Sequence, residues 1–377
     1  MKFSVLSDYL KDHLDVVNRV ISNKSQLSIM EYVLFEIEGN KVKLTATDGE
    51  TRMLTSMELE SKDGDDISFC VRAKQLLDPL KEIPNLVMSF EIDMEKLILE
   101  ANYGMGSFSF PLLQGSEFPN SEALTSESVK IEMPVSTFAE GLESTIYAAS
   151  VEEIRPVMTG VHLDIRPEHL SFVATNGFLL ALYRHSALDL GVTERTQVTI
   201  QRKPADLLRS LFARANEDEM LTVEIFHNYA VFRSPSMELQ CRLLEGKYPN
   251  YETVIPTDND KVMEADRLQL LSATTRVKVF ADKGMQLVSF DYSPQQLTLK
   301  ASDSDFSTSA EESVPVSFSA ESARFSFRAD HVIQILRALP TQNISMKIGD
   351  SARAALLSPI GGEVGVEITV AMMPLMF

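Results

Sequence analysis

Positively charged side chains recur at the start of segments with a helical pattern. Three stretches with a helical pattern each open with them: Arg72 and Lys74, then Arg202 and Lys203, then Arg328. Residues 202–216 hold four cations against one acid, a local net charge of +3 in a chain whose formal net charge is −19. Ordinary solvated positions would explain any one of these helices. The recurrence instead predicts a basic surface that holds nucleic acid by its phosphates without reading bases.

Residues that could support catalysis or hold a metal are scattered. There is no glycine-rich phosphate loop, HExxH, paired CxxC or GxSxG motif. The pairs Asp303 with Asp305 and Asp258 with Asp260 could be metal ligands, but loop carboxylates are the simpler interpretation, since no third ligand lies at a fitting spacing. We therefore expect no enzyme, no metal and no cofactor. The six histidines each sit alone: His13, His162, His169, His185, His227 and His331.

The elements that would position the cations come from a repeat. Residues 33–49 alternate apolar and polar side chains, turn at Gly39 and Asn40, and resume the alternation, which predicts a β-hairpin with one buried face. The pattern returns in residues 161–177 and 288–303. Its equivalent positions lie 128 and then 127 residues apart, as in Val42, Leu170 and Leu297. Three hairpins in phase at this spacing indicate a repeated domain.

Length and periodicity together predict three domains of like fold. The chain has 377 residues and 44% hydrophobic residues, and a period near 128 divides it into residues 1–125, 126–255 and 256–377. Helical patterns within 3–21, 131–149 and 328–339, among others, alternate with runs of strands. This order predicts an α+β class with two helices per domain on antiparallel sheet.

The two cysteines and the N-terminal residues indicate the cellular compartment. Cys70 and Cys241 lie in apolar, strand-like segments, which favours buried free thiols over a disulfide or metal site. The chain has no run of 18 apolar residues, and its first residues, MKFSVLSDYLKDHL, are no signal peptide, so a cytoplasmic protein is expected. Two other classes lack their signatures: a β-rich enzyme needs clustered catalytic groups, and a cell-surface adhesion repeat needs a signal peptide.

Short motifs in a fixed order give a family resemblance. They are the hairpin ends Ala46-Thr47-Asp48-Gly49 and Ala174-Thr175-Asn176-Gly177, the boundary Tyr248-Pro249-Asn250-Tyr251 and the tail Met373-Pro374-Leu375. Together with the repeat, they resemble the bacterial DNA polymerase III β subunit family, the β sliding clamps, over the whole chain. The resemblance implies a head-to-tail homodimer that closes a six-domain ring around duplex DNA. Such a ring catalyses nothing and tethers the replicative polymerase, the clamp loader and other partners.

Three sets of site residues follow from the resemblance. Weak DNA contacts are expected from Lys24, Arg72, Lys74, Arg155, Arg202 and Lys203. Dimer contacts are expected from Phe108 and Phe110 of one subunit and Val279 and Phe280 of the other, although core packing explains Phe110 equally well. The expected pocket for partner peptides consists of Met158, Thr175, Gly177, Phe178, Leu180, Pro249, Val254, Met373, Pro374, Leu375, Met376 and Phe377.

The sequence departs from the family at the peptide pocket. A His-Arg pair usually follows the glycine and is here Phe178-Leu179, and the usual basic residue before the last position is Met376. We therefore expect a more apolar pocket than is usual in the family.

A ring of the implied kind is also plausible in size. Twelve helices spaced roughly 9 Å apart make a circle of about 34 Å, and subtracting helix radii of ~5 Å leaves a hole of about 24 Å, wide enough for a duplex.

Overall fold

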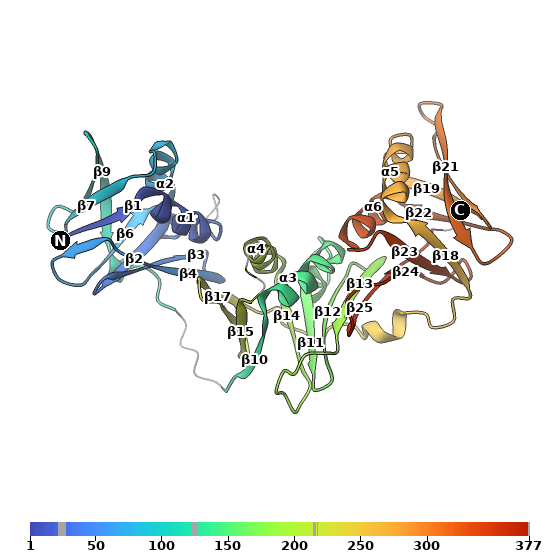
Figure 1. Cartoon of the computed structure of the whole chain (residues 1–377), viewed down its shortest axis with the longest axis horizontal. Helices are drawn as coiled ribbons and strands as arrows, with labels where there is room; N and C mark the ends of the chain where they lie inside the picture. Colours follow the sequence, from blue (N-terminus) through green and yellow to red (C-terminus); the bar gives the residue numbers. More distant parts are fainter. Residues whose placement is uncertain (22–27, 122–126, 214–215, 217, 376–377) are drawn as a thin grey trace. The chain divides into compact units, whose positions relative to one another are not determined.

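The computed structural model describes residues 1–21, 28–121, 127–213, 216 and 218–375, which form two compact units. Unit 1 contains Met1–Ser136 and Ser210–Leu243, and unit 2 contains Thr137–Arg209 and Leu244–Phe377. Each unit is built on one antiparallel sheet, of 13 strands in unit 1 and 12 in unit 2 (Figure 1). The predicted α+β class with antiparallel sheets is confirmed.

The sheet of unit 1 takes its strands from two separate parts of the chain. In sheet order they are β10 (Val129–Pro134), β15 (Met220–Ile225), β16 (Tyr229–Arg233), β17 (Met237–Arg242), β4 (Thr51–Glu58), β3 (Lys41–Thr47), β2 (Tyr32–Glu38), β6 (Ile67–Arg72), β9 (Gly106–Gln114), β8 (Ile98–Tyr103), β7 (Val87–Asp93), β1 (Lys2–Leu6) and β5 (Ser61–Asp63). The 3-10 segments η1 (Ser28–Glu31) and η2 (Gly115–Glu117) also belong to this unit.

Two helices cover part of this sheet. Helix α1 (Ser7–Asn18) packs on β3 and β4, helix α2 (Ala73–Glu82) packs on β6, and the two helices contact each other (Figure 1). Both are amphipathic, and their leucines at helical spacing are buried. The two cysteines lie in this unit, on β6 and β17, and both are buried free thiols, as predicted.

The sheet of unit 2 likewise joins two stretches of sequence. Its strands, in sheet order, are β14 (Thr196–Ile200), β11 (Val161–Arg166), β12 (His169–Thr175), β13 (Leu179–His185), β25 (Val366–Met372), β24 (Ala355–Pro359), β23 (Asn343–Ile348), β18 (Lys261–Asp266), β21 (Thr308–Phe318), β20 (Gln296–Asp303), β19 (Leu287–Ser293) and β22 (Ala323–Arg328). Gly361 and Gly362, both with positive φ, lie in the connection between β24 and β25.

Helices in unit 2 pack in pairs. Helix α5 (Arg267–Lys278) contacts α6 (Ala329–Ala338), as Figure 1 shows. Helix α3 (Val135–Glu143) packs Phe138 against Phe172 of β12, and helix α4 (Arg202–Phe212) contacts α3 through an ion pair between Arg209 and Glu143. The remaining 3-10 segments are η3 (Ile146–Ala148), η4 (Pro156–Thr159) and η5 (Tyr251–Val254).

The three predicted hairpins are present, as β2–β3, β11–β12 and β19–β20. Strands of neighbouring repeats, however, also pair with each other. Strand β4 pairs with β17, and β13 pairs with β25. Each sheet therefore runs without a break across a predicted domain boundary, and the boundaries at 125 and 255 stay a prediction. No helix in the described parts of the chain is long and apolar enough to cross a membrane.

Candidate functional site

The predicted cations lie where a strand ends and the second helix of each repeat begins. Arg72 is the last residue of β6 and Arg328 is the last of β22, and each immediately precedes its helix. Their backbones have nearly the same conformation, with φ −64° and ψ 116° at Arg72 and φ −67° and ψ 120° at Arg328. Arg202 is the first residue of α4, the corresponding helix in the middle of the chain. The recurrence seen in the sequence is therefore a recurrence in structure.

Folding alone does not favour cations at these positions. The N-terminal end of a helix carries partial positive charge, which favours acidic side chains in the first turn and disfavours basic ones by about 0.3–1 kcal/mol each. Neither α2 nor α4 has an acidic residue in its first turn. The helix end and the cations together attract anions, in the way that helix N-termini bind phosphate.

Local contacts hold two of these arginines loosely. Arg72 pairs with Glu31 at 3.4 Å and lies 5.5 Å from the ring centroid of Tyr32. Arg202 donates to the carbonyl oxygen of Ala149 at 3.3 Å. The side chains of the other predicted DNA contacts, Lys74, Arg155 and Lys203, are exposed, and Lys24 lies outside the described residues.

A groove of about 920 Å³ adjoins the cations of unit 1. It lies between the end of α1, helix α2 and strand β9, and its lining includes Arg72, Lys74 and Lys81 together with Phe110. The structure thus brings a predicted dimer residue next to the predicted DNA contacts. Phe110 is buried, whereas Phe108 is half-buried and stacks on Tyr103 at 4.7 Å between ring centroids.

Each unit has one long strand with an unpaired edge. Strand β9 pairs with β8 over residues 106–111 but with β6 only at residues 112–114, so one edge of 106–111 has no partner among the described strands. Strand β21 pairs with β20 over 308–315 and with β18 only at 316–318, which leaves an edge of 308–315 in the same state. Val279 is 78% exposed and Phe280 is 39% exposed, directly after α5.

The predicted peptide-pocket residues gather around one face of the sheet in unit 2. Thr175, Leu180 and Ala371 lie directly opposite one another on β12, β13 and β25, and the amide of Met373 donates to the carbonyl oxygen of Phe178 at 2.9 Å. The amide of Leu375 donates to the carbonyl oxygen of Ser326 on β22 at 2.8 Å. The tail therefore bonds to the turn between β12 and β13 at Met373 and to β22 at Leu375.

The members of this set differ in exposure. Met158, Thr175, Leu180 and Pro374 are buried, and Leu375 is half-buried. Phe178 is 54% exposed and Val254 is 56% exposed, and Pro249 and Met373 are exposed as well. Met376 and Phe377 lie outside the described residues. We call the exposed apolar side chains Phe178, Val254 and Met373 the apolar rim.

The turn that carries Phe178 is rigid for a local reason. The Asn176 side-chain oxygen accepts hydrogen bonds from the amides of Phe178 and Leu179, at 3.0 and 2.8 Å. Gly177 has φ +90°, a conformation that favours glycine, and no atom lies within 4 Å of where its Cβ would be. The turn therefore holds the Phe178 ring away from the sheet.

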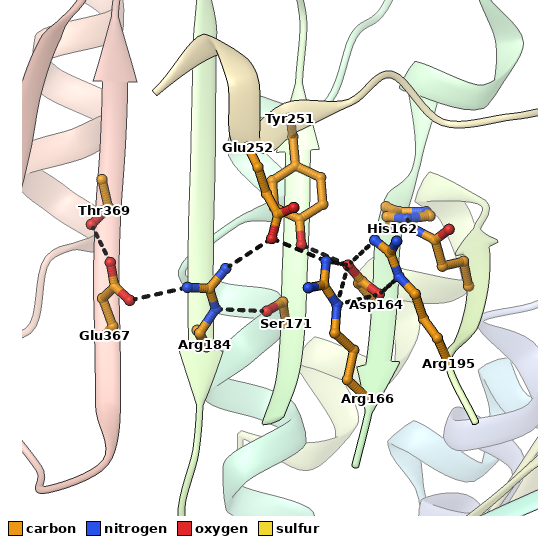
Figure 2. Close-up of polar contacts among 11 residues, drawn as sticks. His162, Asp164, Arg166, Ser171, Arg184, Arg195, Tyr251, Glu252, Glu367 and Thr369 are labelled. Carbon is orange, nitrogen blue, oxygen red and sulfur yellow. Dashed lines mark hydrogen bonds and ion pairs between the residues drawn. The ribbon is translucent and has the colours of Figure 1, made fainter. Parts of the chain in front are cut away.

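A polar network that the sequence analysis did not predict lies on the same sheet face. Ser171, Arg184 and Glu367 lie directly opposite one another on β12, β13 and β25, and Asp164 on β11 is opposite Ser171. We call these four residues the polar row (Figure 2). The segment Tyr248–Val254 covers the sheet between the polar row and the apolar rim, with Tyr248 and Tyr251 packed against Val173, Leu180 and Leu182.

Asp164 is the centre of this network, and its side chain is fully buried. Arg195 binds both of its oxygens, at 2.8 and 2.7 Å, and Arg166 donates to Oδ2 at 2.8 Å. The Tyr251 hydroxyl donates to the same oxygen at 2.7 Å. Burial opposes the charge, but the hydrogen bonds from Arg195, Arg166 and Tyr251 outweigh it and hold the pKa of Asp164 well below its usual range.

Comparison with known proteins accounts for nearly the whole chain. Models of the N-terminal, central and C-terminal domains of the DNA polymerase III beta subunit match residues 1–122, 132–250 and 252–375. The chain belongs to the DNA polymerase III beta subunit family. The predicted resemblance is thereby confirmed.

Relatives and solved structures agree with this family. The beta sliding clamp of Synechococcus elongatus is 27% identical, over 100% of this chain and 99% of its own length. That of Pseudomonas putida is 25% identical over 96% of this chain and 97% of its own length. The fold matches a DNA polymerase III subunit beta from Pseudomonas aeruginosa bound to griselimycin, with a TM-score of 0.93, 23% identity and full coverage of both chains.

Membership in the DNA polymerase III beta subunit family also fixes the broad activity. The family is that of the beta sliding clamps, non-catalytic processivity factors of the DNA polymerase III holoenzyme. Among the residues that the structure describes, no three His, Cys, Asp or Glu side chains gather as a metal site. The three surfaces described above are the candidate functional sites.

Proposed function

We propose that two copies of this chain close head to tail into a ring around duplex DNA, and that the ring tethers a DNA polymerase and other replication proteins to the template. The observation that carries the proposal is the recurrence of cations at the start of the second helix in all three repeats. One such helix would be ordinary, but three equivalent ones in a chain of net charge −19 support a role in binding a polyanion.

The contacts to DNA are weak and exchangeable. Arg72, Lys74, Arg155, Arg202, Lys203 and Lys24 pair with phosphates in any sequence, because phosphate contacts carry no base information. The acidic remainder of the surface repels DNA, which keeps the duplex within the ring. Retention then comes from enclosure, and tethering raises the effective concentration of the polymerase at the primer end.

Ring closure uses the two unpaired strand edges. The edge of β9 in one subunit meets the edge of β21 in the other, and a two-fold axis repeats the contact, so that both edges are covered. Val279 and Phe280 of one subunit bury against Phe108 and Phe110 of the next. Exposed apolar side chains beside unpaired backbone are what such an interface requires.

Partner proteins dock on the apolar rim. Phe178, Val254 and Met373 are exposed apolar side chains around a buried core, and methionine adapts to differently shaped partners. We propose that griselimycin, the ligand of the Pseudomonas aeruginosa relative, binds this chain at the apolar rim. The setting for these interactions is the cytoplasm, where the bacterial chromosome is replicated.

Retention on DNA tests the ring. The protein is loaded by its clamp loader and ATP onto nicked circular DNA, and half of the sample is then cut once to make it linear. We expect the protein to stay on circles in high salt and to be lost from the linear molecules through their ends. Equal loss from circular and linear DNA would contradict the ring.

A further inference from the structure

We propose that the polar row, with Arg166 and Arg195, is a positioning device that fixes the segment Tyr248–Val254 as a rigid wall of the partner site. This inference rests on the proposed docking at the apolar rim. The wall carries Pro249 and Val254, both exposed, while Tyr248 and Tyr251 are buried and pack into the core. Figure 2 shows the segment passing over the network, with Tyr251 and Glu252 reaching down to it.

Tyr251 is the first anchor of the wall. Its ring is buried in the core with Leu180 and Leu182, and its hydroxyl donates to Asp164 at 2.7 Å. Because the two arginines hold the Asp164 carboxylate, the oxygen that accepts the hydrogen bond from Tyr251 is fixed in position. Core packing and the hydrogen bond to Asp164 together therefore fix the position and the orientation of the Tyr251 ring.

Glu252 is the second anchor and joins the wall to the tail. Its carboxylate lies 3.0 Å from Arg166 and 3.6 Å from Arg184. Arg184 also pairs with Glu367 at 3.5 Å, on the strand β25 that leads to Met373. One chain of alternating charges thus connects the wall with the strand that carries the tail.

A stacked pair braces the other end of the segment. The rings of His162 and Tyr248 are 4.2 Å apart and nearly parallel, and Thr199 bonds to Nδ1 of the histidine at 3.0 Å. Burial lowers the pKa of His162 to about 4, so the imidazole is neutral at physiological pH. The wall is accordingly supported from below at Tyr248, Tyr251 and Glu252.

Stability alone does not account for this arrangement. Glu252 is 43% exposed at its side chain, and ion pairs of such exposure contribute little to folding. A buried ion pair is often no better than apolar packing of the same volume, whereas it does impose a defined geometry. A binding wall profits from that geometry, because a pre-ordered surface spares a ligand the entropy of ordering it.

Two conservative substitutions separate positioning from folding. Tyr251→Phe keeps the buried ring and removes its hydroxyl, and Glu252→Gln keeps the side-chain shape and removes its charge. Glu132→Gln is the control, since Glu132 makes an exposed ion pair with Lys130 in unit 1. Griselimycin binding is measured by calorimetry at rising salt, with melting temperature and hydrogen exchange of residues 248–255 followed in the same proteins.

We expect Tyr251→Phe and Glu252→Gln each to bind griselimycin about three- to tenfold more weakly. Exchange in the wall should rise, while the melting temperature stays near that of the wild type. The wild-type affinity should fall with salt, because salt screens the Glu252 pairs, and the affinity of Glu252→Gln should not. Glu132→Gln should match the wild type throughout.

Two results would overturn the inference, and they differ in what else they overturn. If the variants bind griselimycin as tightly as the wild type, or bind it normally while melting earlier, the network is structural and the proposed docking site still stands. If the wild type itself fails to bind griselimycin, or binds it without protecting residues 248–255, the proposed use of the apolar rim fails along with the inference.

Discussion

Phe178 shows how one residue can change the chemistry of a surface. The Asn176 hydrogen bonds and the positive φ of Gly177 hold its ring outward, next to the point where the Met373 amide bonds to the chain. An exposed phenyl ring at this place favours an apolar partner over a charged one.

Removing this ring should weaken partner binding. In Phe178→Ala, griselimycin loses an apolar contact surface, and we expect binding to weaken by about tenfold, since burying a phenylalanine side chain contributes about 1.5–3 kcal/mol at most. Calorimetry measures the loss. Phe306→Ala is a matched control, because Phe306 is also an exposed phenylalanine of unit 2. Unchanged binding by Phe178→Ala would contradict the assignment of the apolar rim.

Asp164 should make unit 2 sensitive to acid. The pKa of its carboxyl is lower in the folded than in the unfolded chain, so its contribution to stability is complete above the unfolded value, ~3.9. That contribution declines as the pH falls below this value, because folding then requires the loss of a proton. We expect the urea midpoint of the wild type to drop steeply in this range.

Asp164→Asn tests the assignment. The substitution removes the charge that Arg166 and Arg195 bind, which should cost about 1.5–3 kcal/mol at neutral pH. The cost stays in this range because Arg195 is 46% exposed and Arg166 keeps its pair with Glu252. The substitution should also flatten the decline of the urea midpoint below pH ~4. A variant that keeps the steep acid dependence of the wild type would show that other carboxyl groups cause it.

At the level of elements, the apolar periodicity of the sequence predicted individual hairpins and helices, which depend on residues close together in the chain. Alternation predicted the hairpins, and apolar residues at helical spacing predicted α1, α2, α4 and α6, because each of these elements needs only one apolar face. The pairing of β4 with β17 and of β13 with β25 was not predicted, since alternation says that a strand has a buried face and nothing about its neighbours. The short strand β5 was also missed.

The polar row was missed for a related reason. Val161, Leu163 and Ile165 were interpreted as the buried face of a hairpin strand, which left His162 and Asp164 on a face expected to meet solvent. In the structure both are buried, because the segment Tyr248–Val254 covers that face. The run Leu179-Leu180-Ala181-Leu182-Tyr183 carried the missing signal: it is apolar on both faces, which indicates a strand buried on both sides.

The strand-to-helix cations should act additively on DNA. Substituting Arg72, Lys203 or Arg328 by alanine would remove one proposed phosphate contact each. We expect each substitution to lower the slope of log affinity against log salt by about one unit, without changing preference among sequences. Equilibrium binding to short duplexes at several salt concentrations measures this. Lys96→Ala, at an exposed lysine paired with Asp93, should leave the slope unchanged; a similar loss there would mean that charge acts non-specifically.

At the scale of the whole molecule, closure depends on a small apolar contact. The double substitution Val279→Asp and Phe280→Asp places two charges in the proposed apolar interface. We expect the dissociation constant of the dimer to rise at least about 100-fold. Analytical ultracentrifugation reports the mass, and retention on circular DNA should disappear with the dimer. Val364→Asp is the control, since Val364 is 90% exposed on the turn before β25. A double variant that stays dimeric would exclude these residues from the interface.

The ladders β4–β17 and β13–β25 have a practical consequence for dissecting the protein. A gene fragment that ends near residue 125 would lose four strands of its sheet and leave β4 bare, and one that starts near 256 would strip β25 of its neighbour in the same way. Such fragments expose unpaired strand edges, so we expect them to aggregate into inclusion bodies. Fragment boundaries drawn from the internal repeat would thus cut through the strand pairings that complete each sheet.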